Sequence, residues 1–113
     1  MDLDTFLSKI GQDDSLDFKH CMEVIQAHYD YQATGFTNGT VRNEAGQNEG
    51  SCKIFSFAKL NGLDEARTLA CFGNFYLDVV KSPQGTDHAN IRAFMASGWD
   101  GVAFDSDALT RKG

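Results

Sequence analysis

The stretch NEAGQNEGSCKIF, from Asn43 to Phe55, gathers residue types that could do chemistry in this chain. Ser51 is expected to cap a helix over residues 52–60, which would place Cys52 in the first turn. Unpaired backbone N–H groups and the helix dipole at that position favour a thiolate and lower the pKa of a cysteine. Cys52 therefore has two interpretations, an activated thiol or a small buried apolar residue.

A second polar motif, TDHANIR, supplies the partner that such a thiol would need. His88 could act as the base for Cys52, with Asn90 orienting the imidazole, as in cysteine–histidine nucleophilic catalysis. In the structural alternative, Asp87 caps a helix while His88 and Arg92 form an exposed i, i+4 pair. Cys52 and His88 are the catalytic candidates, and whether the chain is an enzyme stays open.

The same two segments carry amide and basic side chains suited to a carboxylate, a phosphate or a peptide backbone. We expect one binding face to combine the 38–53 loop with the start of a helix over residues 87–97. The expected ligand-binding residues are Asn38, Asn43, Asn48, Glu49, Ser51, Lys53, Asn90, Arg92 and Trp99. The expected partner is a small anionic ligand or another protein.

Several other kinds of site are excluded by spacing. GQNEGSCK is no nucleotide P-loop, because Gly46 and Gly50 enclose three residues and the lysine is displaced from the second glycine. His20 and His28 lie without an acidic residue that would complete a zinc motif such as HExxH. We expect no metal site and no cofactor.

Composition points to one globular domain over residues 1–113, with a net charge of −6 and a pI near 4.8. That charge works against binding to nucleic acid or to an anionic membrane. Residues 1–33 hold seven acidic residues against two lysines. Three cysteines cannot all pair within the chain, so reduced thiols in a cytosolic setting are expected. No segment approaches the ~18–20 apolar residues of a membrane span, and no cleaved signal peptide is expected.

Apolar spacing of three and four residues predicts the helices. They are expected over residues 3–10, 17–30, 52–60, 65–81 and 87–97, and the first belongs to an N-terminal helix and turn over residues 1–16. Asp17 and Asp64 are expected to cap the second and fourth helices, and Thr86 or Asp87 the last. For KIFSF, within the third helix, a strand is the alternative because Phe55 and Phe57 alternate with a serine.

The strands are expected to be few and short. Asn38-Gly39 predicts a two-residue hairpin turn of type I′, which needs positive φ at both positions. WDGVAF, starting at Trp99, is expected to form a strand that pairs with the hairpin over residues 36–42, and residues 106–113 a loose tail. The expected fold is a helix-rich α+β domain of four to five helices with a small sheet of short antiparallel strands.

The ordered motifs of the chain resemble the HopJ type III effector family. The resemblance rests on FTNGTVRNEAGQNEGSCKIFSFAKLNGL, TLACFGNFYLDVV and GTDHANIRAFMASGWDGVAF, preceded by VIQAHYDY, and runs from about Phe18 to Phe104. It implies an uncharacterised bacterial protein without established catalytic residues. The expected function is a small ligand- or protein-binding module, and the alternative is a small thiol enzyme using Cys52 and His88.

The resemblance also bears on localisation. Type III export signals are typically unstructured, rich in serine and poor in acidic residues. Here the acidic residues Asp2 and Asp4 stand at the start of the sequence, serines are sparse, and residues 3–10 are expected to be helical. We therefore expect residence in the bacterial cytoplasm, with secretion into a host cell by a type III system as the alternative.

Overall fold

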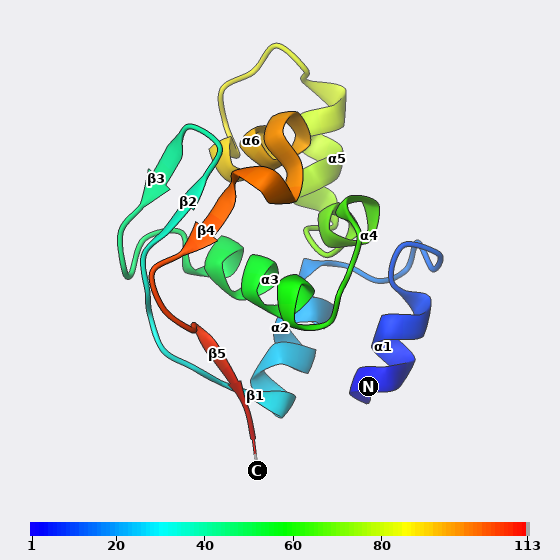
Figure 1. The fold of residues 1–113 in the computed structure, drawn as a ribbon. Coiled ribbons are helices and arrows are strands. Elements are labelled where there is room, and N and C mark those ends of the chain that lie inside the picture. Colours follow the sequence, from blue (N-terminus) through cyan, green and yellow to red (C-terminus); the bar gives the residue numbers. More distant parts are fainter. Residues whose placement is uncertain (113) are drawn as a thin grey trace.

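The computed structural model describes residues 1–112, which form six α-helices and two small antiparallel sheets (Figure 1). The helices are α1 Leu3–Lys9, α2 Phe18–His28, α3 Glu49–Leu60, α4 Glu65–Ala70, α5 Asn74–Lys81 and α6 Ala89–Ser97. A 3-10 turn, η1 Gly98–Gly101, follows α6. The predicted helix-rich α+β class is confirmed, with six helices in place of four to five and two sheets in place of one. No helix in residues 1–112 is long and apolar enough to cross a bilayer.

Aspartate caps start α2 and α4 where the sequence predicts them. The carboxylate of Asp17 accepts a hydrogen bond from the Phe18 amide at 2.7 Å, and that of Asp64 accepts one from the Arg67 amide at 2.8 Å. The Asp17 amide in turn donates to Nδ1 of His20 at 2.9 Å. These bonds satisfy backbone groups that a helix start otherwise leaves unpaired.

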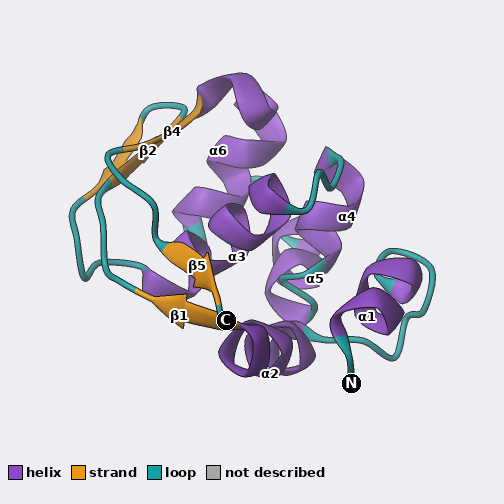
Figure 2. Ribbon diagram, turned by 60° about the horizontal axis from the view of Figure 1, so that its bottom comes forward, coloured by secondary structure: helices purple, strands orange, loops and turns teal. Residues whose placement is uncertain are grey.

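The five strands lie along one side of the molecule, away from α1, α4 and α5 (Figure 2). In one sheet, β2 Phe36–Asn38 lies between β3 Val41–Asn43 and β4 Val102–Phe104, and all pairs are antiparallel. The predicted pairing of the WDGVAF segment with the hairpin is thus confirmed for its last three residues, while the first part forms η1.

The second sheet corrects the prediction of a loose tail over residues 106–113. β5 Leu109–Arg111 pairs with β1 Tyr29–Tyr31, and Leu109 is buried. A single buried leucine is too weak a local signal to predict a strand, which depends here on a partner far away in the sequence. Gly113 lies outside the described residues.

The hairpin turn lies one residue later than predicted. Asn38 is the last residue of β2 and pairs with Val41, so that Gly39 and Thr40 form the turn. Gly39 has φ +60°, but Asn38 does not adopt the positive φ that the predicted type I′ turn requires. The physical reason is that the Asn38 side chain is fully buried and held by Asn90, whose backbone oxygen accepts from its Nδ2 at 2.8 Å.

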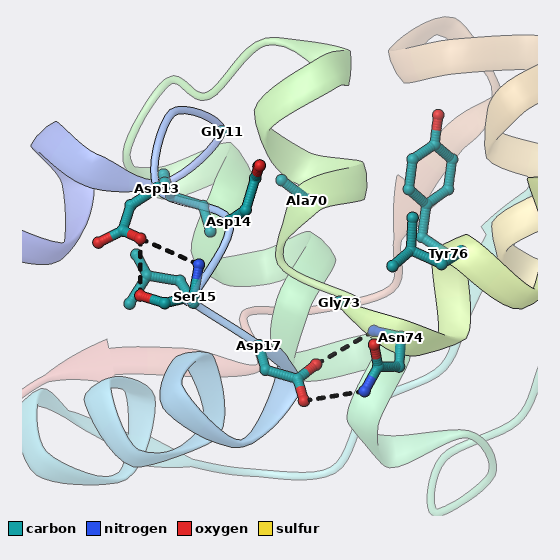
Figure 3. A pocket seen from close by; sticks show the side chains of 12 residues that line it. Gly11, Asp13, Asp14, Ser15, Asp17, Ala70, Gly73, Asn74 and Tyr76 are labelled. Carbon is teal, nitrogen blue, oxygen red and sulfur yellow. Dashed lines mark hydrogen bonds between the residues drawn. The ribbon is translucent and has the colours of Figure 1, made fainter.

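The predicted single helix over residues 65–81 is wrong, because the chain breaks between α4 and α5 at Gly73. This glycine has φ +56°, and a Cβ there would overlap Oδ1 of Asp17. The same carboxylate accepts hydrogen bonds from the backbone amide of Asn74 at 3.1 Å and from its Nδ2 at 3.3 Å (Figure 3). One aspartate side chain therefore starts both α2 and α5.

Helix α3 forms the centre of the core, with the other helices and the strands around it (Figure 1). Residues 54–58 are all buried, which explains why KIFSF shows alternation in sequence and yet is helical. The ring of Phe55 packs against those of Phe36, Phe72, Phe94 and Trp99. The strand alternative for this segment is therefore wrong.

Candidate functional site

A pocket of about 260 Å³ lies where the N-termini of α3 and α6 approach each other. The start of α3 contributes its N-cap Asn48 with Gly50 and Ser51 to the lining, and the start of α6 contributes its N-cap His88 with Ala89 and Asn90. The 38–53 segment and the start of the 87–97 segment therefore meet, as the predicted binding face requires. We call this cavity the α3–α6 pocket.

Both helices begin in the same unusual way. Their N-cap residues, Asn48 and His88, have φ values of 50° and 53° and are the two non-glycine residues with positive φ in residues 1–112. A non-glycine residue in this left-handed region costs roughly 1–2 kcal/mol. In the described part of the chain no side chain caps either helix. Asparagine and histidine adopt this region more readily than most non-glycine residues, but the local sequence does not single out these two positions, since none of the other asparagine and histidine residues in the described chain has positive φ.

The first turn of each helix leaves amide groups available at the pocket. The first intrahelical bonds run from the Cys52 amide to the Asn48 oxygen at 3.0 Å and from the Arg92 amide to the His88 oxygen at 3.2 Å. The N–H groups of residues 49–51 and 89–91 precede these bonds and have no acceptor within their helices. Two sets of N–H donors and two positive dipole ends thus adjoin one cavity.

Four predicted asparagines form a hydrogen-bonded cluster behind the pocket. Oδ1 of Asn43 accepts from Nδ2 of Asn48 at 2.7 Å and from Nδ2 of Asn90 at 2.9 Å. Oδ1 of Asn90 accepts from Nδ2 of Asn43 at 3.0 Å and from Nδ2 of Asn38 at 3.1 Å. Asn38, Asn43 and Asn90 are buried, so the cluster ties the β2–β3 hairpin to both helix starts. Of the four, Asn48 and Asn90 line the pocket.

The opposite wall of the α3–α6 pocket is apolar and comes from Phe18, Phe72, Phe75 and Ile91. The rings of Phe18 and Phe75 meet edge to face with centroids 5.0 Å apart, and Phe75 lies 5.4 Å from the imidazole of His88. The sequence does not single out Phe18, Phe72 or Ile91, because their spacing is that of ordinary core stripes. Nor does it single out Gly50, where a Cβ would come within 3.1 Å of the Phe18 ring.

Two predicted basic ligands do not line the pocket. Nζ of Lys53 lies 4.7 Å from the centre of the Tyr31 ring, on another side of α3. The guanidinium of Arg92 donates to the Asp87 backbone oxygen at 2.6 Å and to its carboxylate at 2.7 Å. The Arg92 guanidinium lowers the pKa of the Asp87 carboxyl group. Asp87 is therefore an ion-pair partner here, and the predicted cap at Thr86 or Asp87 is wrong.

Of the remaining predicted ligands Ser51, Glu49 and Trp99, one lines the α3–α6 pocket. Ser51 lines the α3–α6 pocket but does not cap α3, which begins at Glu49. Glu49 is exposed in the first turn of α3, where a negative charge suits the helix dipole. Nε1 of Trp99 donates to the Leu63 oxygen at 3.1 Å, and the indole packs against Phe94.

Cys52 lies in the second turn of α3 because the helix starts three residues earlier than predicted. Its side chain is only 1% exposed and its Sγ lies 3.8 Å from the Thr34 oxygen. Burial raises the pKa of this thiol, which is the opposite of the lowering expected for a first-turn cysteine. Nε2 of His88 lies 3.7 Å from the Asp78 carboxylate and 3.6 Å from that of Asp87.

A larger hollow of about 590 Å³ lies between the α1–α2 loop and α5 (Figure 3). Asp13, Asp14 and Asp17 line it from the loop, and Tyr76 and Leu77 line it from α5. We call it the α1–α5 groove. Within residues 1–112, no group of three or more histidine, cysteine, aspartate or glutamate side chains is placed to hold a metal ion.

Comparison with known proteins identifies relatives of the whole chain. None of the curated proteins matches it. The crystal structure of VPA0580, a protein of unknown function, matches with a TM-score of 0.96 and 47% sequence identity, over 99% of this chain and 95% of that one. The family model of the HopJ type III effector protein matches residues 3–109. The chain therefore belongs to the HopJ type III effector protein family.

Proposed function

We propose that this protein is a small binding module whose α3–α6 pocket holds a compact ligand bearing a carboxylate or a phosphate group. One observation carries the proposal. Two helices, of 12 and 9 residues, begin at the same pocket without a side-chain cap in the described part of the chain. An anion bound there would accept hydrogen bonds from N–H groups that the helices leave unpaired.

Anion binding at the α3–α6 pocket requires no basic side chain. A single helix N-terminus stabilises a negative charge by about 0.3–1 kcal/mol at an exposed site, and two that converge act on the same charge. The bent backbone at Asn48 and His88 keeps both starts directed at the pocket, and the asparagine cluster holds them in place. Preorganised donors of this kind reduce the cost of ordering the site when a ligand binds.

Pocket size and lining narrow the class of ligand. The volume of about 260 Å³ lies below the range of roughly 300–1,000 Å³ typical for drug-sized molecules. The apolar wall around Phe18, Phe72 and Phe75 offers contact to a short hydrocarbon or aromatic group. A small organic acid, or the acidic end of a longer molecule, fits both the N–H donors and the apolar wall of the pocket.

An NMR titration of the ¹⁵N-labelled protein with phosphate, acetate and benzoate tests the proposal. We expect saturable amide shifts at residues 49–51 and 89–91. Ala89→Asp places a carboxylate in the first turn of α6 and should weaken anion binding by about tenfold or more. Ala96→Asp is the matched control, because it makes the same charge change near the other end of α6.

Two results would contradict the proposal. Shifts that cluster away from both helix starts would place the site elsewhere, and equal losses in the two alanine variants would reduce the effect to net charge. Lys53→Ala provides a further check. Its ammonium group lies over Tyr31 and not at the pocket, so this variant should bind as the wild type does.

The thiol-enzyme alternative has less support, because the buried Cys52 has a raised pKa. Alkylation of the native protein with iodoacetamide, followed by peptide mass spectrometry, distinguishes the two functions. We expect Cys52 to react as slowly as the buried Cys21 and Cys71 below pH 8, and all three to react once urea unfolds the chain. Fast reaction of Cys52 alone would restore the enzyme hypothesis, and His88→Ala would follow.

For localisation we propose the bacterial cytoplasm, with delivery into a host cell by a type III system as the alternative. Residues 3–9 form α1, and its Phe6 side chain is fully buried in the core. An export signal is read from an unfolded segment, whereas this one contributes to the folded structure. The full chain with a reporter fused to its C-terminus, expressed in a type III-competent strain, should remain inside the cells.

A further inference from the structure

Helix α5 presents aliphatic side chains to solvent. Leu77 is 49% exposed and Val80 is 51% exposed, and the two lie three residues apart on one face of the helix. Tyr76 precedes Leu77, and both line the α1–α5 groove. Leu77 thus borders the groove, and Val80 continues the exposed aliphatic face of α5 beside it. An exposed apolar face rimmed by polar residues is typical of an interaction site.

The other wall of the α1–α5 groove is negatively charged. Asp13 and Asp17 have lowered pKa values, because Ser15 hydrogen-bonds the first carboxylate and backbone N–H groups bond the second. Both bonds to Asp13 end on its Oδ1, so that they do not use Oδ2 (Figure 3). Asp14 is exposed beside them. The groove thus combines an apolar edge with ionised carboxylates held in fixed positions.

The charge of the surrounding chain determines which occupant fits. Residues 1–33 hold seven acidic residues against two lysines, and the whole protein has a net charge of −6. A second copy of this chain would bring like charge to the groove and be repelled. A partner with positive charge beside an apolar face would meet both walls.

We propose that the α1–α5 groove docks a basic amphipathic helix of a partner protein. The apolar side of that helix covers Leu77 and Val80, and its lysine or arginine side chains reach Asp13 and Asp14. This is the helix-in-groove mode of peptide recognition, with carboxylates at the rim for orientation and selectivity. The groove is separate from the α3–α6 pocket, and the proposal is independent of the anion-binding function.

A fluorescein-labelled model peptide of roughly 18 residues, built from leucine and lysine with one apolar face, tests the proposal by anisotropy. We expect saturable binding that weakens as salt increases, with amide shifts at residues 13–17 and 74–80. Leu77→Ser with Val80→Ser should weaken binding by about tenfold. Asp14→Lys should weaken it by about threefold at low salt.

Matched controls separate the groove from general surface effects. Leu60→Ser removes another aliphatic group, 58% exposed, and Asp107→Lys reverses another exposed charge, so both should bind like wild type. Equal losses in these controls would overturn the proposal. Absence of binding at millimolar peptide would also overturn it, as would equal binding of a leucine–glutamate peptide of the same pattern. Self-association through Leu77, detected by analytical ultracentrifugation, would assign the face to a second copy.

Discussion

Two pairs of helix starts in this protein are treated in opposite ways. At α2 and α5, the single carboxylate of Asp17 accepts from the amides of Phe18 and Asn74. At α3 and α6, within the described residues, no side chain caps either start, and both begin at a left-handed residue. In the first pair, the anion that accepts the amide hydrogen bonds is the side chain of Asp17. In the second pair, the α3–α6 pocket occupies the equivalent position.

The difference distinguishes helix starts with a structural role from helix starts that can bind a ligand. A helix start that is satisfied by its own side chain contributes to stability and has little left to offer a ligand. A start that is left unsatisfied beside a cavity, at some cost in backbone strain, can use the same N–H groups for binding. Variants that remove the cap of the first pair, or add a negative charge to the second pair, test this comparison.

The largest effect is expected at the α4–α5 break. Gly73→Ala combines a φ of +56° with a Cβ that overlaps Oδ1 of Asp17, and should lower the free energy of unfolding by about 3 kcal/mol or more. Gly62→Ala is the control, since Gly62 also has positive φ, +65°, but no atom lies within 4 Å of its Cβ position. It should lose about 1 kcal/mol. Urea denaturation measures both, and equal losses would show that Asp17 does not impose the break.

Removal of the shared cap comes next. Asp17→Ala leaves the starts of α2 and α5 without their acceptor and should cost about 2 kcal/mol, twice a typical cap. Asp64→Ala removes the cap of α4 alone and should cost about 1 kcal/mol. If urea denaturation gives the same loss for both variants, Asp17 acts on one helix only and the comparison of the two pairs fails.

The Asp17 cap also predicts a dependence on pH. Hydrogen bonds from the Phe18 and Asn74 amides lower the pKa of this carboxyl group in the folded state. Its contribution to stability is therefore complete above the unfolded value of about 3.9 and is lost as the pH falls through the folded value. The advantage of wild type over Asp17→Asn should be present at neutral pH and shrink below about pH 4. An advantage that stays constant in urea denaturation from neutral to acid pH would assign the effect to shape and not to charge.

The smallest effect concerns the uncapped pair. Ala89→Asp supplies α6 with the negative charge that its first turn lacks and should raise the free energy of unfolding by about 0.3–1 kcal/mol. The same variant should lose anion binding, as proposed above. Thermal denaturation measures the gain, with Ala96→Asp as the control that should gain nothing. A variant that is stabilised and still binds phosphate normally would separate α6 from the binding site.

Much of the candidate site follows from sequence, but its basic residues do not. The segments around Ser51 and Asn90 were expected to share a face, and both line the pocket. Lys53 follows Ser51 by two residues, which turns its side chain about 200° around the helix. Arg92 is bound by Asp87 instead. Residue type predicted that Lys53 and Arg92 are ligands. The position of Lys53 around the helix and the ion pair of Arg92 with Asp87 keep both side chains away from the pocket.

Features that depend on neighbours along the chain could be predicted from the sequence alone. Asp17 and Asp64 start helices because an acceptor lies next to free amides, and the apolar spacing places most helices within a few residues. The ordered motifs also indicate the HopJ family, which the family model confirms over residues 3–109. These signals are local or cumulative, so no knowledge of the packed structure is needed to find them.

Three features could not be predicted from the sequence: the start of α3, the break between α4 and α5, and the strand over residues 109–111. The break and the strand depend on contacts between distant segments, namely Asp17 with Asn74 and Leu109 with Tyr31. At the start of α3, Asn48 donates to Asn43, which is held in turn by the distant Asn90. Cys52 lies on the buried face of α3, and this burial raises the pKa of its thiol. Contacts between distant segments leave no periodic pattern in the sequence. The predicted reactive cysteine at a helix start is therefore buried in the structure, and two uncapped helix starts meet at one pocket instead.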